Sequence, residues 1–302
     1  MAYALARDVP ITENDVAICM THGLFGSHLG LAFQDERGKA RLVHLANHQR
    51  MRIEDYPVEN WVAKVVPFDP LESMQLLPFL RAYTEKLDLR GSNDIEYGIS
   101  VIAGRGAFDA QWNYRPERGS NGFTCATMIN EFFHEPGFPL LDTSGWPKSA
   151  ANAIWGDSVV CMLRAGGEAS ADHIAAVQQT NSGQRITPEE VAAAADQPRE
   201  SRPVDYATAS LGAPAAMAAM LSMCGPPTPI PHDSPYAQCV LHYSQTGKPC
   251  APILPAPPSP VLQIVAPLAR PVAQPVRRVV KGKRNDPCAC QSGKKFKHCC
   301  GK

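Results

Sequence analysis

The sequence predicts an α+β fold, in which an antiparallel sheet is covered by packed helices and followed by a long C-terminal appendage. Apolar strand patterns recur in the first 165 residues, and one amphipathic helix pattern follows them. Residues 166–224 are Ala-rich and helical in pattern. Proline then dominates to about residue 275, and the chain ends in closely spaced cysteines. A length of 302 residues allows one larger domain, or two ordinary ones, with appendages.

The first strands are predicted from apolar runs and from alternation. "DVAICMT" (15–21) is typical of a buried strand. "SHLGLAF" (27–33) and "RLVHLAN" (41–47) should pair as a hairpin. The hydrophobic alternation of the two strands requires Leu29 opposite Leu45 and Leu31 opposite Val43, because that register buries all the large side chains on one face. The loop between the strands is then 35–39.

The same register predicts a pair of histidines on the opposite face of the hairpin. His28 and His44 then lie diagonally across the ladder, at roughly 7–8 Å between Cα atoms. Two imidazoles can form a hydrogen bond across that gap. Gly30 and Ala46 share this face, and their small side chains leave room for a substrate and a thiol.

"YGISVIAG" (97–104) is predicted to be a further strand, and "TCATMINEFF" (124–133) a helix with one apolar face. Cys125 begins this helix, after Gly122, with Thr124 as a candidate cap. A helix N-terminus stabilises a thiolate, so Cys125 is a candidate nucleophile that we expect to have a lowered thiol pKa. The alternative is a buried structural cysteine.

The order His, His, Cys along "GSHLGLAF…LVHLANH…FTCATMINEFF" resembles the circularly permuted branch of the NlpC-type papain-like hydrolases, which includes lecithin:retinol acyltransferase. The resemblance covers about residues 10–145. It implies a papain-like sheet with a packed helix, Cys125 as nucleophile, His28 as general base and His44 as the orienting residue.

Two neighbours in "LVHLANH", Asn47 and His48, are rival candidates for the third position of such a site. The hairpin register favours His44. The long segment between Asn47 and Thr124 is a departure from the compact spacing of that family.

The Ala-rich region suggests helices but no chemistry. "TPEEVAAAA" (187–195) has Thr187 as a cap, Pro188 in the first turn and Glu190 three residues after the cap, which is a capping box. We expect four regions: a papain-like domain at 1–165, an Ala-rich helical extension at 166–224, a Pro-rich linker with a basic run at 225–284, and a zinc motif at 285–302.

Four C-terminal cysteines have the spacing of a small metal site. Cys288, Cys290, Cys299 and Cys300 follow the pattern C-x-C-x8-C-C. Thiolates in two pairs at the ends of a short loop suit a structural Zn²⁺ ion, and metal binding would supply the folding free energy of so short a segment. A disulfide pair is the alternative.

"NDPCACQSGKKFKHCCGK" resembles the SEC-C motif, the zinc-binding motif at the C-terminus of the SecA translocation ATPase. Ala289 and Gln291 depart from the family pattern without replacing a ligand, and His298 lies one position away from it. The resemblance implies Zn²⁺ as a structural cofactor. It also implies docking to an acidic chaperone surface or to the ribosome.

The neutral total charge hides an acidic body and a basic tail. Residues 276–302 have nine Lys and Arg against one acid, a net charge of +8, and the rest of the chain has a net charge of −8. The basic run 277–284 suits an acidic protein or RNA phosphates, unless it only makes the tail soluble. Specific DNA recognition is not expected, because Phe296 is the one aromatic side chain of this segment available for base stacking.

A cytoplasmic location is expected, with reduced or metal-bound cysteines, since neither a signal peptide nor a membrane-spanning helix is evident. The longest apolar run, 211–224, is shorter than the ~18 residues that a span needs. The sequence favours a cysteine-dependent hydrolase of the amidase or peptidase type, acting on a peptide, isopeptide or acyl substrate and targeted by the zinc tail. The alternatives are a non-catalytic adaptor that binds a chaperone or ribosome through the tail, and a nucleic-acid-binding protein.

Overall fold

The computed structural model divides the chain into two compact units, 1–255 and 256–302. The elements and side chains that it describes all belong to the first unit. They are residues 3–23, 26–90, 95–99, 101, 108–109, 111, 113–115, 121–225 and 238. The proposed zinc ligands, nearly all of the predicted linker and the basic run lie outside the described residues.

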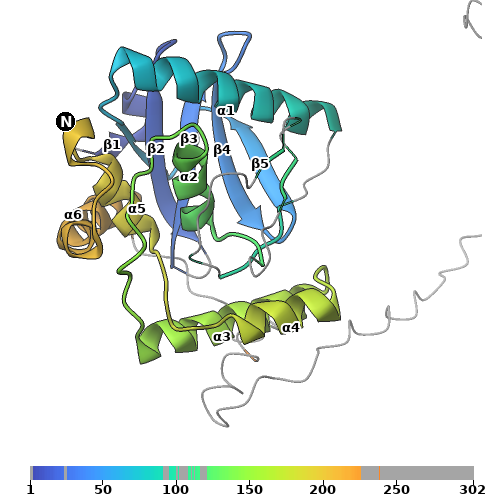
Figure 1. Cartoon of the computed structure of the whole chain (residues 1–302). Helices are drawn as coiled ribbons and strands as arrows, with labels where there is room; N and C mark the ends of the chain where they lie inside the picture. The colour runs from blue at the N-terminus through green and yellow to red at the C-terminus, as the bar shows by residue number, and fades with distance from the viewer. Residues whose placement is uncertain are drawn as a thin grey trace, which may run out of the picture. The chain divides into compact units, whose positions relative to one another are not determined.

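A six-stranded antiparallel sheet forms the centre of the unit, which confirms the α+β class (Figure 1). Its strand order is β1-β6-β2-β3-β4-β5. The strands are β1 (Ala4–Leu5), β2 (Val16–Gly23), β3 (Gly26–Gln34), β4 (Ala40–Asn47), β5 (Arg50–Asp55) and β6 (Val62–Val65), with a 3-10 turn at Ala6–Asp8 after β1.

The hairpin of β3 and β4 has the predicted register. Leu31 pairs with Val43, and the ladder runs from there to Gln34 and Ala40, with 35–39 as the loop. The ladder ends at Leu31, so Leu29 and Leu45 lie beyond it rather than in a regular pair. Both leucines are nevertheless fully buried in the main core, as the alternation predicts.

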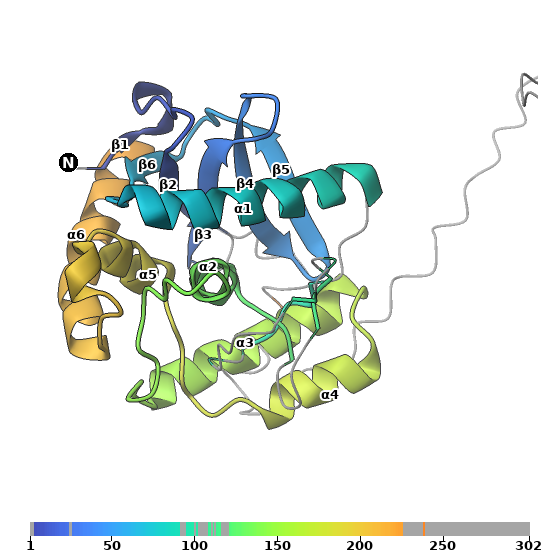
Figure 2. The same cartoon turned by 45° about the horizontal axis from the view of Figure 1, so that its top comes forward.

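Six helices surround the sheet: α1 (Pro70–Arg90), α2 (Cys125–His134), α3 (Ala150–Gly166), α4 (Ala171–Gln179), α5 (Pro188–Ala195) and α6 (Tyr206–Cys224), with a 3-10 turn at Arg199–Ser201. Figures 1 and 2 show α1 and α2 across one face, α5 and α6 beside β1 and β2, and α3 and α4 beyond α2. The predicted helix at 124–133 and the predicted capping box at Thr187 are both present.

The two faces of the sheet are buried in different ways. One face carries the leucines of β3 and joins the apolar residues of α1 and α2 in a large core. A smaller cluster covers the other face with small residues such as Ala17 and Ala32, together with Leu42 and Trp61. By alternation, His28 and His44 belong to this second face.

The predicted strand at 97–104 is not found over its described residues. Tyr97 forms a single bridge with Phe123, and Ile99 donates its N–H to the side chain of Asn121 at 3.3 Å. The backbone of Gly98 lies so close to Asn121 that an added Cβ would come within 2.0 Å of its carbonyl oxygen. Contact with this one segment replaces the regular ladder that the apolar pattern suggested.

Helix α6 is longer than the apolar run suggested, because Asp205 caps it and the helix begins at Tyr206. Among the described residues it is the one helix long and apolar enough to cross a membrane, with 17% of its apolar window buried. The expectation that no apolar stretch is long enough to span a membrane was therefore wrong as far as length and composition are concerned. The helix packs against α5, where Gly212 lies over Ala193, and against β1, β2 and β6.

Candidate functional site

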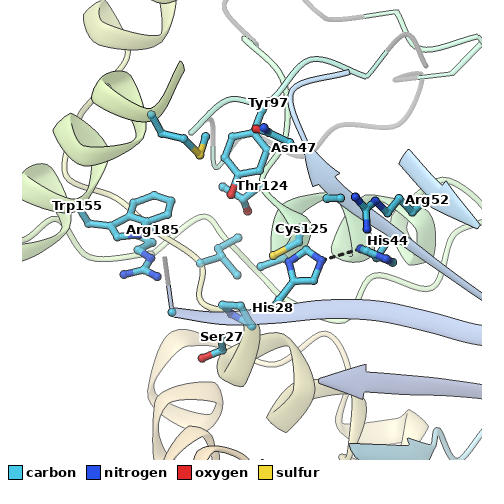
Figure 3. A pocket seen from close by; sticks show the side chains of 16 residues that line it. Ser27, His28, His44, Asn47, Arg52, Tyr97, Thr124, Cys125, Trp155 and Arg185 are labelled. Carbon is cyan, nitrogen blue, oxygen red and sulfur yellow. Dashed lines mark hydrogen bonds between the residues drawn. The ribbon is translucent and has the colours of Figure 1, made fainter. Parts of the chain in front are cut away.

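The predicted histidines and cysteine line one pocket of roughly 270 Å³ (Figure 3). It lies at the end of the β3–β4 ladder, where the start of α2 meets the two strands. Its walls also include residues of α3 and of the segment that leads into α5. The lining residues are Gly26, Ser27, His28, His44, Ala46, Asn47, Arg52, Tyr97, Thr124, Cys125, Ala126, Trp155, Met162, Arg185, Ile186 and Pro188.

The two histidines form the hydrogen bond that the register predicted. His28 Nε2 lies 2.7 Å from His44 Nδ1, and the rings meet edge to face (Figure 3). Gly30 makes this possible, because a Cβ there would come within 3.1 Å of His44 Cβ. Trp61 covers both rings, with centroids 5.7 Å from His28 and 5.3 Å from His44.

The bond between the rings constrains their protons. The carboxylate of Glu54 on β5 lies 3.7 Å from His44 Nε2 and favours a proton on that nitrogen. His44 Nδ1 then accepts, and His28 Nε2 donates. His28 Nδ1 is left with a free lone pair, since it has no hydrogen bond to any residue that the structure describes.

Cys125 is the first residue of α2 and is 5% exposed. Thr124 caps the helix by accepting from the N–H of Thr127 at 3.1 Å, which holds the first turn in place. The regular β3–β4 pairing ends at Leu31, and α2 packs against β3, so that the thiol lies close to the backbone of Leu29. The N–H groups of Leu29 and Ala126 both act to lower the pKa of the thiol.

Burial nevertheless raises the pKa of Cys125 to about 11, so the expected lowered thiol pKa is wrong for the unliganded site. Burial also lowers the pKa of His28 to about 3, with smaller contributions from His44 and Arg52, and lowers that of His44 to about 4. The desolvation of the pocket outweighs the helix N-terminus. The resting site therefore holds a neutral thiol beside neutral imidazoles.

The rival third residues are engaged elsewhere. His48 Nδ1 accepts from the N–H of Tyr97 at 3.2 Å, and its ring lies 4.7 Å from that of His173. Asn47 lines the pocket, but its side-chain oxygen accepts from the N–H of His48. His44 is thus the residue in contact with His28.

Sequence reasoning missed several residues of the site. Arg185 comes from the Ala-rich region 166–224, in which no chemistry was expected. Trp155 lies in the predicted papain-like domain but was not singled out, and Glu54 comes from a strand that was not predicted. For Glu54 the signal was available, since alternation in "RMRIED" (50–55) places it on the face of Arg52, the partner of His44 across the ladder. No short-range pattern marks Arg185, because only tertiary packing brings it to the pocket.

A metal site in this part of the molecule is not indicated. Over the described residues, no group of three or more His, Cys, Asp or Glu side chains could hold a metal ion. Cys19, Cys125, Cys161 and Cys224 are not joined in disulfides. The candidate Zn²⁺ ligands are the four C-terminal cysteines, whose thiolate donors suit that ion.

Comparison with known proteins identifies a SEC-C motif at residues 284–302, which contains all four of these cysteines. The motif binds zinc in SecA. Among curated proteins, the chain is similar to the protein translocase subunit SecA of Treponema denticola, with 70% identity over 30 residues. It is also similar to SecA of Halothermothrix orenii, with 62% identity over 29 residues.

These matches are confined to a short segment. Each covers 10% of this chain and 3% of the SecA sequence. No solved structure matches the chain. Any role for the pocket is therefore argued from its own geometry.

Proposed function

We propose that this protein is a cysteine-dependent acyl hydrolase or transferase with a permuted papain-like arrangement, and that its SEC-C tail binds Zn²⁺ and serves as a docking module. The observation that carries the catalytic half is one pocket lined by Cys125 at a helix start and by the hydrogen-bonded pair His28 and His44. The chain order His, His, Cys supports the permuted arrangement.

The proposed chemistry begins with the neutral site. His28 Nδ1 takes the proton of Cys125 while the sulfur bonds to the carbonyl carbon of an amide or ester. The N–H of Cys125 at the open end of α2 stabilises the oxyanion. His28 then gives the proton to the departing amine or alcohol, leaving a thioester on Cys125.

A water molecule, or an acceptor amine or alcohol, completes the cycle. His28 removes its proton as the oxygen or nitrogen attacks the thioester carbon, and the C–S bond breaks to return the thiol. The imidazolium formed in each half-reaction is stabilised by the hydrogen bond to His44 and by Glu54 beyond it. Because the resting thiol is neutral, each attack is coupled to proton transfer.

The direct test of this proposal is turnover of activated esters and small peptide amides by purified Cys125→Ala protein. We expect a loss of at least about 1,000-fold relative to the unaltered chain, in line with the removal of a nucleophile elsewhere. Cys224→Ala is the matched control, since Cys224 is a free, partly exposed thiol that does not line the pocket. Retained turnover in Cys125→Ala would refute the proposal.

The SEC-C match supports a second function, that of an adaptor whose tail docks on an acidic protein or ribosomal partner. The four cysteines would hold one Zn²⁺ per chain as a structural ion. In this proposal the ion orders the basic segment and takes no part in acyl transfer. We expect the double change Cys288→Ser and Cys290→Ser to remove bound zinc, measured by elemental analysis. Ester turnover should be unchanged in that variant. The four described cysteines of the body form no disulfide, which agrees with the reducing, cytoplasmic compartment that we propose.

A further inference from the structure

A cation that forms no ion pair with any described residue is part of one wall of the pocket. The carbonyl oxygen of Arg185 accepts from Trp146 Nε1 at 2.7 Å, which holds this part of the backbone in place. Its guanidinium carbon lies 3.9 Å from the centre of the Trp155 ring, and Figure 3 shows the two side chains together beside the pocket. The Nε atom is buried and has no hydrogen-bond partner in the described part of the chain.

The nearby acids are bound to other groups. Glu189 accepts a hydrogen bond from Ser27, and Glu190 accepts from the N–H of Thr187 at 2.7 Å in the capping box. Neither comes within ion-pair distance of Arg185, although the charges of both act to raise its pKa. Burial outweighs them and lowers the pKa of Arg185, but a guanidinium stays charged at neutral pH. A partly buried cation without an ion pair to any described residue can accept an anion from outside this part of the chain.

Arginine pairs with carboxylates through two parallel hydrogen bonds, and an aromatic ring behind it fixes the plane of the fork. The volume of roughly 270 Å³ suits an acyl group of amino-acid size and excludes a lipid with two long chains. The positive charge also acts on Cys125, whose thiol pKa it lowers slightly. An anion bound at Arg185 therefore lies within the field of the reacting sulfur.

We infer that Arg185, supported by Trp155, is a subsite for a carboxylate that the acyl substrate carries close to its scissile carbonyl. This inference names the substrate class of the proposed acyl transfer and rests on that function. Binding of an anion at Arg185 does not itself depend on the proposed function. A peptide or isopeptide with a free carboxylate on the residue next to the cleaved bond has this chemistry.

Arg52 provides an internal comparison. It lines the same pocket, but its side chain is 59% exposed and already lies 3.7 Å from the carboxylate of Glu54. Its charge is screened by water and partly neutralised, so it should contribute little to anion binding. Arg52→Gln removes the same charge as Arg185→Gln and is therefore the matched control.

The first experiment compares alkylation of Cys125 by iodoacetamide, iodoacetate and N-(iodoacetyl)glycine in the full chain, followed by peptide mass spectrometry. The two anionic reagents place a carboxylate at different distances from the sulfur. For each anionic reagent, the measured quantity is its alkylation rate divided by that of iodoacetamide at the same cysteine. We expect this ratio to be at least ten times larger at Cys125 than at Cys224 for at least one of the two reagents. Arg185→Gln should abolish that preference, Arg185→Lys should retain part of it, and Arg52→Gln should leave most of it.

If Arg185→Gln and Arg52→Gln reduce the preference for anionic reagents equally, the effect comes from the overall positive charge of the pocket, and the subsite is overturned. A preference that survives Arg185→Gln also overturns it. Calorimetric titration of Cys125→Ala protein with sodium glutarate tests the site without any reaction of the thiol. Binding that disappears when Arg185→Gln is added supports the inference, and absence of binding contradicts it. Retained ester turnover in Cys125→Ala protein with intact glutarate binding would refute the proposed function and leave the subsite standing.

Discussion

Two pairs of histidine rings are in contact among the described residues, and their different surroundings shift their pKa values in opposite directions for His28 and His173. His28 and His44 bond to each other under Trp61. His48 and His173 bond to the backbone of Tyr97, and His173 Nδ1 also lies 3.3 Å from the carboxylate of Glu96. Contact between imidazoles alone therefore does not identify a catalytic pair.

The protonation of the pairs follows from these partners. Burial lowers the pKa of His28 to about 3 and that of His44 to about 4. Burial also acts to lower the pKa of His173, but the hydrogen bonds to Glu96 and to the Tyr97 carbonyl outweigh it, and the pKa is raised. In the first pair, His28 Nδ1 stays unprotonated at neutral pH. In the second pair, His48 and His173 form hydrogen bonds that hold the backbone of Tyr97 at the pocket wall.

The largest expected difference between the pairs is in activity. His28→Gln should lower kcat for ester turnover by about 10² to 10⁴, because it removes the proposed general base. His48→Gln should change kcat less than about tenfold, since His48 contacts backbone and not the thiol. Rates are compared at equal folded fraction, measured by near-UV circular dichroism. Equal losses in both variants would remove the distinction between the pairs.

A smaller effect is expected at Glu54, a positioning residue that acts through His44. Glu54→Gln should lower kcat by about tenfold with little change in KM, because the amide stabilises a proton on His44 Nε2, and the imidazolium, less well than a carboxylate does. Glu54→Asp should recover part of the loss. The readout specific to positioning is the tautomer of His44, followed by ¹⁵N chemical shifts of the imidazole. An unchanged tautomer with unchanged kcat contradicts the role.

The smallest expected effect is a difference between His28 and His173 in how the free energy of unfolding depends on pH. The pKa of His28 in the folded protein is below its ordinary value of 6.5. The contribution of His28 to the free energy of unfolding is therefore present above pH 6.5 and is lost as the pH falls toward about 3. The pKa of His173 is raised in the folded protein. Its contribution to the free energy of unfolding is therefore present below pH 6.5 and is lost as the pH rises through the folded pKa. Each accounts for at most about 1.4 kcal/mol per pH unit.

Urea unfolding of the glutamine variants at several pH values separates the two signs. His28→Gln should flatten the fall in unfolding free energy between pH 6.5 and pH 4. His173→Gln should leave that region unchanged and alter the slope above pH 6.5. The same slope change in both variants would mean that the two environments are alike.

Local patterns were sufficient for the hairpin, the helix at Cys125 and the contact of the two imidazoles. In the hairpin, burial of Leu31 and Val43 on one face leaves a single register, and that register places His28 and His44 together. The capping boxes are equally local. These features depend on residues within one or two turns or strands, and alternation is enough to derive them.

The rest of the site depends on contacts that the sequence does not encode locally. Arg185 reaches the pocket because Trp146 and Trp155 hold its segment there. The thiol pKa also could not be predicted, since the helix N-terminus was visible in "TCATMINEFF" while the depth of burial was not. The same limit applies to 97–104, where contact with Asn121 replaces a ladder.

The most direct test of the central claim is the intact mass and peptide map of the full chain after brief reaction with p-nitrophenyl acetate. The account predicts a single acetyl group on Cys125, formed at least 100 times more slowly in His28→Gln and at an unchanged rate in His48→Gln. Acetylation at other cysteines with none on Cys125, or acetylation of Cys125 that does not depend on His28, would contradict it.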